Sequence, residues 1–255
     1  MYYKQLLAAA ACVGAAMASP AALAATIQIS YTGAADFGQG AVGYDTGYLA
    51  PNPNSPTTAA NVYIGGDSLS SSNTSYGFSS AGQFNAWCVD IYHWMVNSYS
   101  YTVGTPGDLA AMLTSLRPGP DTGTNRVNQL ILLADEVYGS LSSLTDSAAF
   151  QLAVWEIAYG TPGSSGTYQI NSTDPGFNVG SNTAAAAIVE ANGWLTHLNT
   201  AAITGNYQLS FLNDGTPGGA TQDVVVFSRA LTEPDSLALL GLGFAGLFGV
   251  RRKSA

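Results

Sequence analysis

Two residues in the centre of the chain, Cys88 and Gln151, could form a covalent bond with each other. A cysteine thiolate that lies against a glutamine side chain can attack the amide carbonyl and expel ammonia, leaving an internal γ-glutamyl thioester. Such a bond is an acyl donor, and it needs aromatic side chains that exclude water. The sequence offers Trp87 beside the cysteine and Trp155 one helical turn after the glutamine.

Two other kinds of chemistry have weaker support. A cysteine hydrolase would use Cys88 as nucleophile and His93 or His197 as base. His93 follows on the same predicted strand at an odd spacing, so its side chain would point to the opposite face. His197 stays open as the base, although an exposed histidine on a helix face is the simpler explanation. Asp90 and Glu156 are the best-placed carboxylates for a sugar-cleaving pair, but the sequence does not show the cleft that such a pair requires.

No metal centre or organic cofactor is predicted. The chain has two histidines and two cysteines, with neither a His-x-x-x-His nor a Cys-x-x-Cys pattern to supply zinc ligands. The loops at residues 121–125 and 213–215 are acidic, but neither has the ligand spacing of an EF-hand loop.

Gln151 belongs to a predicted helix at residues 147–160, where apolar side chains recur at helical spacing. Thr145 or Asp146 is expected to cap its start, and Gly160 to stop it. Gln151 lies at the edge of the apolar face, where an amide is costly to bury without partners. The ordinary explanation is an amide that bonds its neighbours on the helix edge.

Cys88 belongs to a predicted strand at residues 84–94, rich in aromatic and β-branched side chains. Residues 98–103 are expected to be its hairpin partner. Further strands are predicted at residues 26–32, 41–49, 61–64, 206–212 and 222–228, and the last two are expected to form a hairpin. Further helices are predicted at residues 108–116, 124–138 and 182–198. Exposed loops are predicted at residues 51–56 and 68–75. Strands, then about four helices, then strands predict an α+β domain, an antiparallel sheet or barrel with a helical insertion.

Residues 1–24 have the pattern of a secretory signal peptide. Lys4 precedes an apolar run at 6–18, and the small residues Ala22 and Ala24, on either side of Leu23, form a cleavage site for signal peptidase. Its removal would also remove Cys12, so the exported domain would keep one cysteine and could not form an internal disulfide.

Residues 232–255 carry a second three-part signal. Its parts are Glu233 and Pro234, an apolar run at 237–250, and the basic cluster Arg251, Arg252 and Lys253. A helix of this run would reach about 21 Å, short of the ~30 Å hydrocarbon core, so we expect transient anchoring in the inner membrane with the basic cluster cytoplasmic. The order resembles the PEP-CTERM sorting signals of exported Gram-negative proteins. This resemblance implies removal of the tail by an exosortase during delivery to the cell surface or extracellular matrix.

Composition fits one exported domain. The chain has 255 residues, 47% hydrophobic and 9% charged, which is enough for a sizeable core. The formal net charge of −9 makes nucleic acid or anionic lipid an unexpected partner, because both bind clustered Lys and Arg. Lys4 and Lys253 are the only lysines, so removal of both ends would leave no lysine amine to consume a thioester.

The region at residues 84–200 resembles the thioester domains of bacterial surface adhesins. Their pattern is a cysteine in an aromatic-rich strand, a helical region, and a helix with Thr-Gln-x-Ala-aliphatic-Trp. The matching segments here are Trp87-Cys88-Val89-Asp90 and Phe150-Gln151-Leu152-Ala153-Val154-Trp155, with Phe150 in place of the threonine. The resemblance implies that Cys88 and Gln151 are the cross-linked pair and that Trp155 packs over it.

We therefore expect an exported protein of the cell surface or biofilm matrix, with a thioester-like domain at residues 25–231. The thioester would attach it covalently to an extracellular polymer or surface ligand that bears amines or hydroxyls. The chain is not expected to be an enzyme. Two alternatives stay open: a non-covalent structural matrix protein in which Cys88 and Gln151 are only packed, and a cysteine hydrolase.

Overall fold

The computed structural model describes the central domain of the chain. The described residues are 26–35, 45–49, 60–79, 82–181, 183–215 and 219–230. The predicted signal peptide, the sorting tail and the loop expected at residues 51–56 lie outside them. None of the helices in these ranges is both long and apolar enough to cross a membrane.

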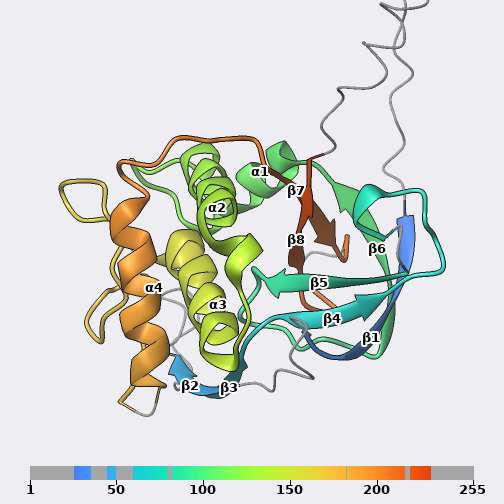
Figure 1. The fold of residues 1–255 in the computed structure, drawn as a ribbon, viewed down its shortest axis with the longest axis horizontal. Coiled ribbons are helices and arrows are strands. Elements are labelled where there is room, and N and C mark those ends of the chain that lie inside the picture. Colours follow the sequence, from blue (N-terminus) through green and yellow to red (C-terminus); the bar gives the residue numbers. More distant parts are fainter. Residues whose placement is uncertain are drawn as a thin grey trace, which may run out of the picture.

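Six antiparallel strands close into a barrel in the order β1-β4-β5-β8-β7-β6 (Figure 1). Their bounds are β1 Thr26–Ala34, β4 Asp67–Ser70, β5 Gln83–Cys88, β6 Ser98–Gly104, β7 Tyr207–Asn213 and β8 Val224–Arg229. Alternation along β1 buries Ile27 and Ile29 in the barrel and exposes the residues between them. Closure leaves no edge open for pairing with another chain. A separate two-stranded sheet is formed by β2 Asp45–Leu49 and β3 Ala60–Ile64.

Four α-helices are inserted between β6 and β7 (Figure 1). They are α1 Pro106–Leu116, α2 Gly123–Val137, α3 Leu144–Tyr159 and α4 Ala185–His197. α3 begins with a capping box. The Ser143 hydroxyl accepts from the Asp146 N–H, and the Asp146 carboxylate accepts from the Ser143 N–H. α3 lies between α4 and the barrel, so every residue from Ser147 to Tyr159 is buried.

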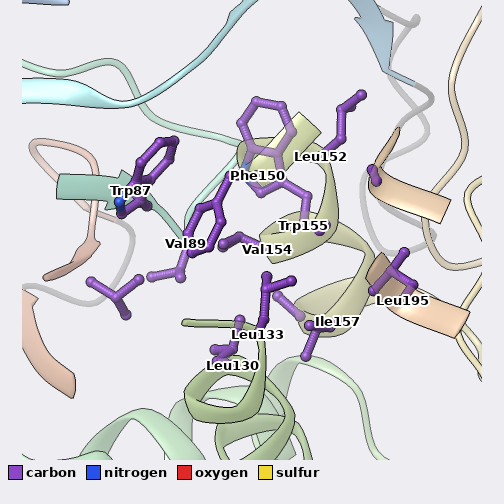
Figure 2. Close-up of a cluster of buried hydrophobic side chains, with 14 of the residues drawn as sticks. Trp87, Val89, Leu130, Leu133, Phe150, Leu152, Val154, Trp155, Ile157 and Leu195 are labelled. Carbon is purple, nitrogen blue, oxygen red and sulfur yellow. The ribbon is translucent and has the colours of Figure 1, made fainter. Parts of the chain in front are cut away.

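The core around α3 joins the helices to the barrel. Figure 2 shows Trp87 of β5 facing Phe150 of α3, with Leu130 and Leu133 of α2 on one side and Leu195 of α4 on another. The ring centroids of Trp87 and Phe150 are 4.5 Å apart, and both residues are fully buried. Large apolar side chains buried in this way each contribute about 1.5 to 3 kcal/mol to folding, so this contact fixes α3 against β5.

The predicted fold class is confirmed: the domain is α+β, with an antiparallel barrel, four inserted α-helices and a hairpin of β7 and β8. Two strand predictions are wrong. β5 ends at Cys88 and does not pair with β6, which instead pairs with β1 and β7. Part of the loop predicted at residues 68–75 is β4, where Leu69 is fully buried between polar residues and pairs with both neighbouring strands.

Two predictions about the central helix are also wrong. The N-cap is Ser143, and Asp146 is instead the third residue of the capping box. The helix has no exposed face between Ser147 and Tyr159, because α4 covers the side that faces away from the barrel. Gln151 is therefore fully buried rather than at the edge of an apolar face.

Gly160 caps the end of α3 at a position with no room for a side chain. Its φ is −63°, but a Cβ at this position would lie 2.3 Å from Oε1 of Glu156. We expect Gly160→Ala to lower the free energy of unfolding by about 2 kcal/mol, as overpacking of a core does. Urea denaturation measures this. Gly163→Ala is the control, since its Cβ would meet only a carbonyl oxygen at 3.6 Å; equal losses in the two variants would contradict the steric explanation.

Candidate functional site

The side chain of Gln151 reaches from α3 to the end of β5 and binds the main chain of Cys88. The Cys88 N–H donates to Gln151 Oε1 at 3.0 Å, and Gln151 Nε2 donates to the Cys88 carbonyl oxygen at 2.9 Å. The structure thus brings together the two residues singled out from the sequence. The ordinary explanation, an amide bonded to its helix neighbours, is wrong because both bonds go to a distant strand.

The strand topology explains why the N–H and carbonyl oxygen of Cys88 have no partner on β4. The ladder between β4 and β5 ends where Asp67 pairs with Ala86, because the chain before Asp67 turns away toward α3. There the Gly66 N–H donates to the Ser147 hydroxyl at 3.0 Å. Buried main-chain groups need partners. Beyond this point the Gln151 amide replaces β4 as the partner of β5. It binds both the N–H and the carbonyl oxygen of Cys88.

The Cys88 thiol is buried and held as a protonated donor. Sγ donates to the main-chain oxygen of Asp90 at 3.0 Å. Burial, and then the nearby charges of Asp90 and Asp67, raise the pKa of the Cys88 thiol well above its usual value. The Trp155 indole partly offsets this rise, although its N–H makes no hydrogen bond of normal geometry to a described residue. The thiol must therefore lose a proton before it can act as a nucleophile.

The pair is buried among aromatic residues of the core. Gln151 is fully buried and Cys88 is 3% exposed, while Trp87 is fully buried and Trp155, 3% exposed, has its ring centroid 6.2 Å from that of Phe177. Phe150, where the family pattern has threonine, packs against Trp87 and against Phe227 of β8 at 5.6 Å. It is therefore a core residue that fixes α3, and it supplies no hydroxyl beside Gln151.

Residues 89–97 form a loop after β5, and this loop carries a pair that sequence reasoning missed. His93 Nδ1 is in short contact with Oδ2 of Asp90, and the two side chains are 30% and 14% exposed. His93 lies on this loop and not on a strand, so the alternation that was expected to turn its side chain to the face opposite Cys88 does not apply. The Asp-x-x-His spacing, typical of a turn, is the signal that could have revealed the pair.

The alternative base, His197, is elsewhere. It ends α4 with 71% of its side chain exposed, and its ring pairs with Glu136 of α2 at 3.4 Å. Glu156, considered for a carboxylate pair with Asp90, is fully buried in α3. In the part of the chain that the structure describes, no group of three or more His, Cys, Asp or Glu side chains is placed to hold a metal ion.

The sorting residues Glu233, Pro234, Arg251, Arg252 and Lys253 lie outside the described residues, and a sequence comparison addresses them. The family described as the PEP-CTERM protein-sorting motif matches residues 231–253. The chain carries a PEP-CTERM sorting motif. This match confirms the resemblance seen in the tail, implies processing by an exosortase and supports export to the cell surface. No curated protein matches the sequence at a significant level.

Two solved structures have similar folds. The N-terminal domain of the Streptococcus pyogenes pilus tip adhesin Cpa is 11% identical, with a TM-score of 0.41, covering 73% of this chain and 94% of that one. The N-terminal thioester domain of a protein F2 like fibronectin-binding protein from Streptococcus pneumoniae is 10% identical, with a TM-score of 0.43, covering 78% and 100%. The chemistry of the present site rests on its own contacts.

Proposed function

We propose that this exported protein forms an internal thioester between Cys88 Sγ and the side-chain carbonyl carbon of Gln151, and uses it to bind an extracellular target covalently. One observation carries the proposal. The buried Gln151 amide is held by two hydrogen bonds, 3.0 and 2.9 Å long, against the same residue that bears the lone thiol of the described chain. Neither group needs to cross the domain to react.

The two hydrogen bonds also suit the chemistry of bond formation. When the sulfur attacks the carbonyl carbon, negative charge develops on Gln151 Oε1, which already accepts from the Cys88 N–H. A donor aimed at a developing oxyanion is a large source of transition-state stabilisation. The carbon–nitrogen bond then breaks, and the amide nitrogen leaves as ammonia with the proton that the thiol has lost.

Transfer to the target reverses the role of the sulfur. An amine or hydroxyl of the target attacks the thioester carbonyl, the carbon–sulfur bond breaks, and Cys88 regains a proton. The product is an amide or ester at the Gln151 side chain. The bond can be used once, so the protein acts as an attachment module without turnover. The burial of Cys88 and Gln151 supports the proposal, since water would otherwise hydrolyse the thioester.

Intact mass of the purified mature domain tests this proposal. We expect a deficit of one ammonia, which methylamine reverses by adding to Gln151, and a full mass in both Cys88→Ala and Cys88→Ser. The serine variant is the matched control, because it keeps the shape of the thiol but is a poorer nucleophile. A full mass in freshly prepared, reduced wild-type protein would exclude the thioester.

A second candidate, a non-covalent matrix protein, has support from the same contacts. The Gln151 amide satisfies both main-chain groups of Cys88, which is sufficient reason for a buried glutamine without any reaction. This function predicts that Cys88→Ala leaves attachment to extracellular polymer unchanged. The thioester predicts that attachment resistant to boiling in detergent is lost in the same variant.

A further inference from the structure

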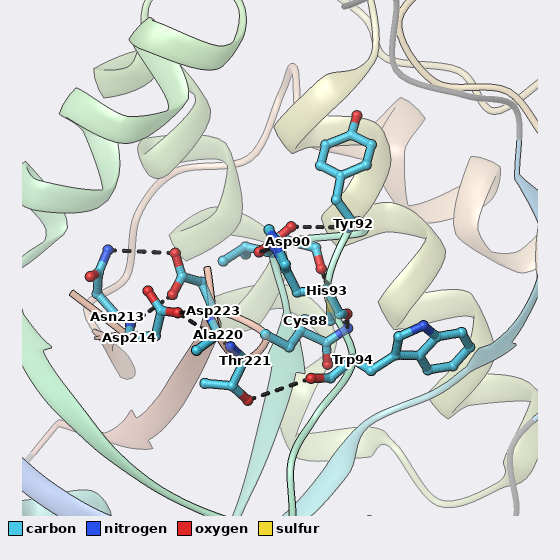
Figure 3. A network of polar contacts seen from close by, with 12 residues as sticks. Cys88, Asp90, Tyr92, His93, Trp94, Asn213, Asp214, Ala220, Thr221 and Asp223 are labelled. Carbon is cyan, nitrogen blue, oxygen red and sulfur yellow. Dashed lines mark hydrogen bonds and ion pairs between the residues drawn. The ribbon is translucent and has the colours of Figure 1, made fainter. Parts of the chain in front are cut away.

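The loop at residues 89–97 is fixed by the connection between β7 and β8. Gln222 Nε2 donates to the main-chain oxygens of Asp90 and His93, at 3.4 and 3.2 Å. The Thr221 hydroxyl accepts from the Val96 N–H at 3.2 Å. Figure 3 shows Cys88, Asp90 and His93 together, with Asp214 and Asp223 to their left. The loop therefore holds its side chains in set positions beside the cysteine.

Asp90 contacts both the thiol and the imidazole, through two different groups. Its main-chain oxygen accepts from Cys88 Sγ, and its carboxylate holds His93 Nδ1. The other carboxylate oxygen accepts from the Tyr92 N–H at 3.0 Å, which fixes the side chain of Asp90. One face of the His93 ring lies over Gly219, where a Cβ would come within 2.7 Å of the ring. The imidazole is thus oriented from two sides.

We propose that His93, oriented by Asp90, is the base that removes the Cys88 proton when the thioester forms and that serves the attacking nucleophile when the thioester is transferred. This inference rests on the proposed function. The chain has two histidines, and the other one lies on α4 in a pair with Glu136. His93 is held by the residue whose main-chain oxygen accepts from the Cys88 thiol, and imidazole is the side chain best suited to exchange protons near neutral pH.

The tautomer follows from the contact with Asp90. In the neutral ring Nδ1 carries the hydrogen that is donated to the carboxylate, and the basic lone pair is on Nε2. In thioester formation this lone pair receives the thiol proton, directly or through one water, and passes it to the departing ammonia. In transfer it receives the proton of the attacking amine or hydroxyl and gives it to the Cys88 sulfur. Both steps leave His93 unchanged.

Two carboxylates act on this base: Asp90 by contact and Asp223 through its charge. Further titratable groups lie around these two, namely Tyr92 on the same loop, Cys88 at the end of β5, Asp214 at the connection between β7 and β8, and Tyr159 of α3. Burial, and then the charges of Asp90 and Asp214, raise the pKa of Asp223 to about 7, while the hydrogen bond from the Asp214 N–H and, less strongly, His93 lower it. The negative groups favour the positive imidazolium that forms during proton transfer.

The test compares rates of thioester transfer in His93→Gln, Asp90→Asn and His197→Gln with the wild type. Methoxyamine is the probe, because this weakly basic amine stays unprotonated while His93 titrates. We expect the wild-type rate to fall as the pH is lowered and the imidazole becomes protonated. His93→Gln should be at least about tenfold slower near neutral pH and nearly independent of pH, and added imidazole should restore part of its rate. His197→Gln, the matched histidine control, should behave as wild type.

The outcomes separate this inference from the proposed function. If the wild-type domain shows no ammonia deficit, both the thioester and the role of His93 are excluded. An ammonia deficit with an unchanged rate and pH dependence in His93→Gln overturns only the role of His93. If His93→Gln does not fold, as judged by circular dichroism, Asp90→Asn decides: it keeps the volume of the side chain, and a wild-type pH dependence in that variant overturns the inference.

Discussion

Gln151→Leu, made in a Cys88→Ala background, is expected to lower the free energy of unfolding by about 4 kcal/mol, because it leaves two buried main-chain groups unpaired at about 1 to 3 kcal/mol each. These groups are the N–H and carbonyl of residue 88, which bond only to the Gln151 amide in place of β4. Leucine has nearly the same volume, so no cavity forms. The alanine background removes the thiol, so loss of a thioester cannot contribute.

Urea denaturation of the single and double variants measures this loss. Gln83→Leu in the same background is the control, since Gln83 is an exposed residue at the start of the same strand. It should change the stability by less than about 0.5 kcal/mol, as surface substitutions usually do. A loss below about 1 kcal/mol for Gln151→Leu would show that residue 88 finds other partners, and that Gln151 is not needed to complete the end of β5.

Local pattern was sufficient to place each residue of the pair on its helix or strand, and the resemblance to thioester domains implied that the two residues meet. Gln151 follows Phe150 and precedes Val154 at helical spacing, and Cys88 follows Trp87 in a strand with clear alternation. What the pattern could not show is where β5 ends. Tyr92 and Trp94 continue the aromatic run, yet Trp94 is 67% exposed on a loop.

The end of β5 is decided by contacts distant in sequence, which explains why the Asp90 and His93 pair was missed. Gln222, more than a hundred residues later, binds the main chain of the loop. β4 was missed for a related reason: among its four residues only Leu69 is apolar, and two adjacent strands supply the rest of its stability. In both cases tertiary hydrogen bonds override local periodicity.

Glu156 follows Gln151 on α3, and from the sequence it was considered only as a partner of Asp90 in a sugar-cleaving pair. Its burial instead makes the stability of the domain depend on pH. It is fully buried; Oε1 accepts from the Gln169 N–H at 3.2 Å, and Oε2 has no partner among the described residues. Burial, and then the charge of Asp174, raise the pKa of Glu156 from 4.5 to about 8, and Arg126 offsets only a small part. The folded protein therefore holds this carboxyl in its neutral form at neutral pH.

Glu156→Gln is expected to remove a large pH dependence of stability. Because the folded state binds the Glu156 proton more tightly than the unfolded state, this stabilisation is fully present below pH 4.5 and is lost as the pH rises toward about 8. At about 1.4 kcal/mol for each pH unit between these values, the wild type should lose on the order of 5 kcal/mol relative to the variant. Asp223 titrates in the same direction but is present in both proteins, so the difference between them isolates Glu156.

Urea denaturation at several values from pH 4.5 to about 9 measures this difference, and Glu190→Gln is the matched control. Glu190 also has a raised pKa, from burial and from the charge of Asp146, but it lies only half-buried on α4, so solvent screens its effect. The amide in Glu156→Gln keeps the bond from Gln169 and carries no charge at any pH, so its stability should exceed that of the wild type most at alkaline pH. Parallel curves for the wild type and Glu156→Gln would mean that water or a rearranged Arg126 reaches the carboxylate. In that case the C-terminal end of α3, which carries Glu156 and follows Gln151, exposes its side chains to solvent more readily than its contacts indicate.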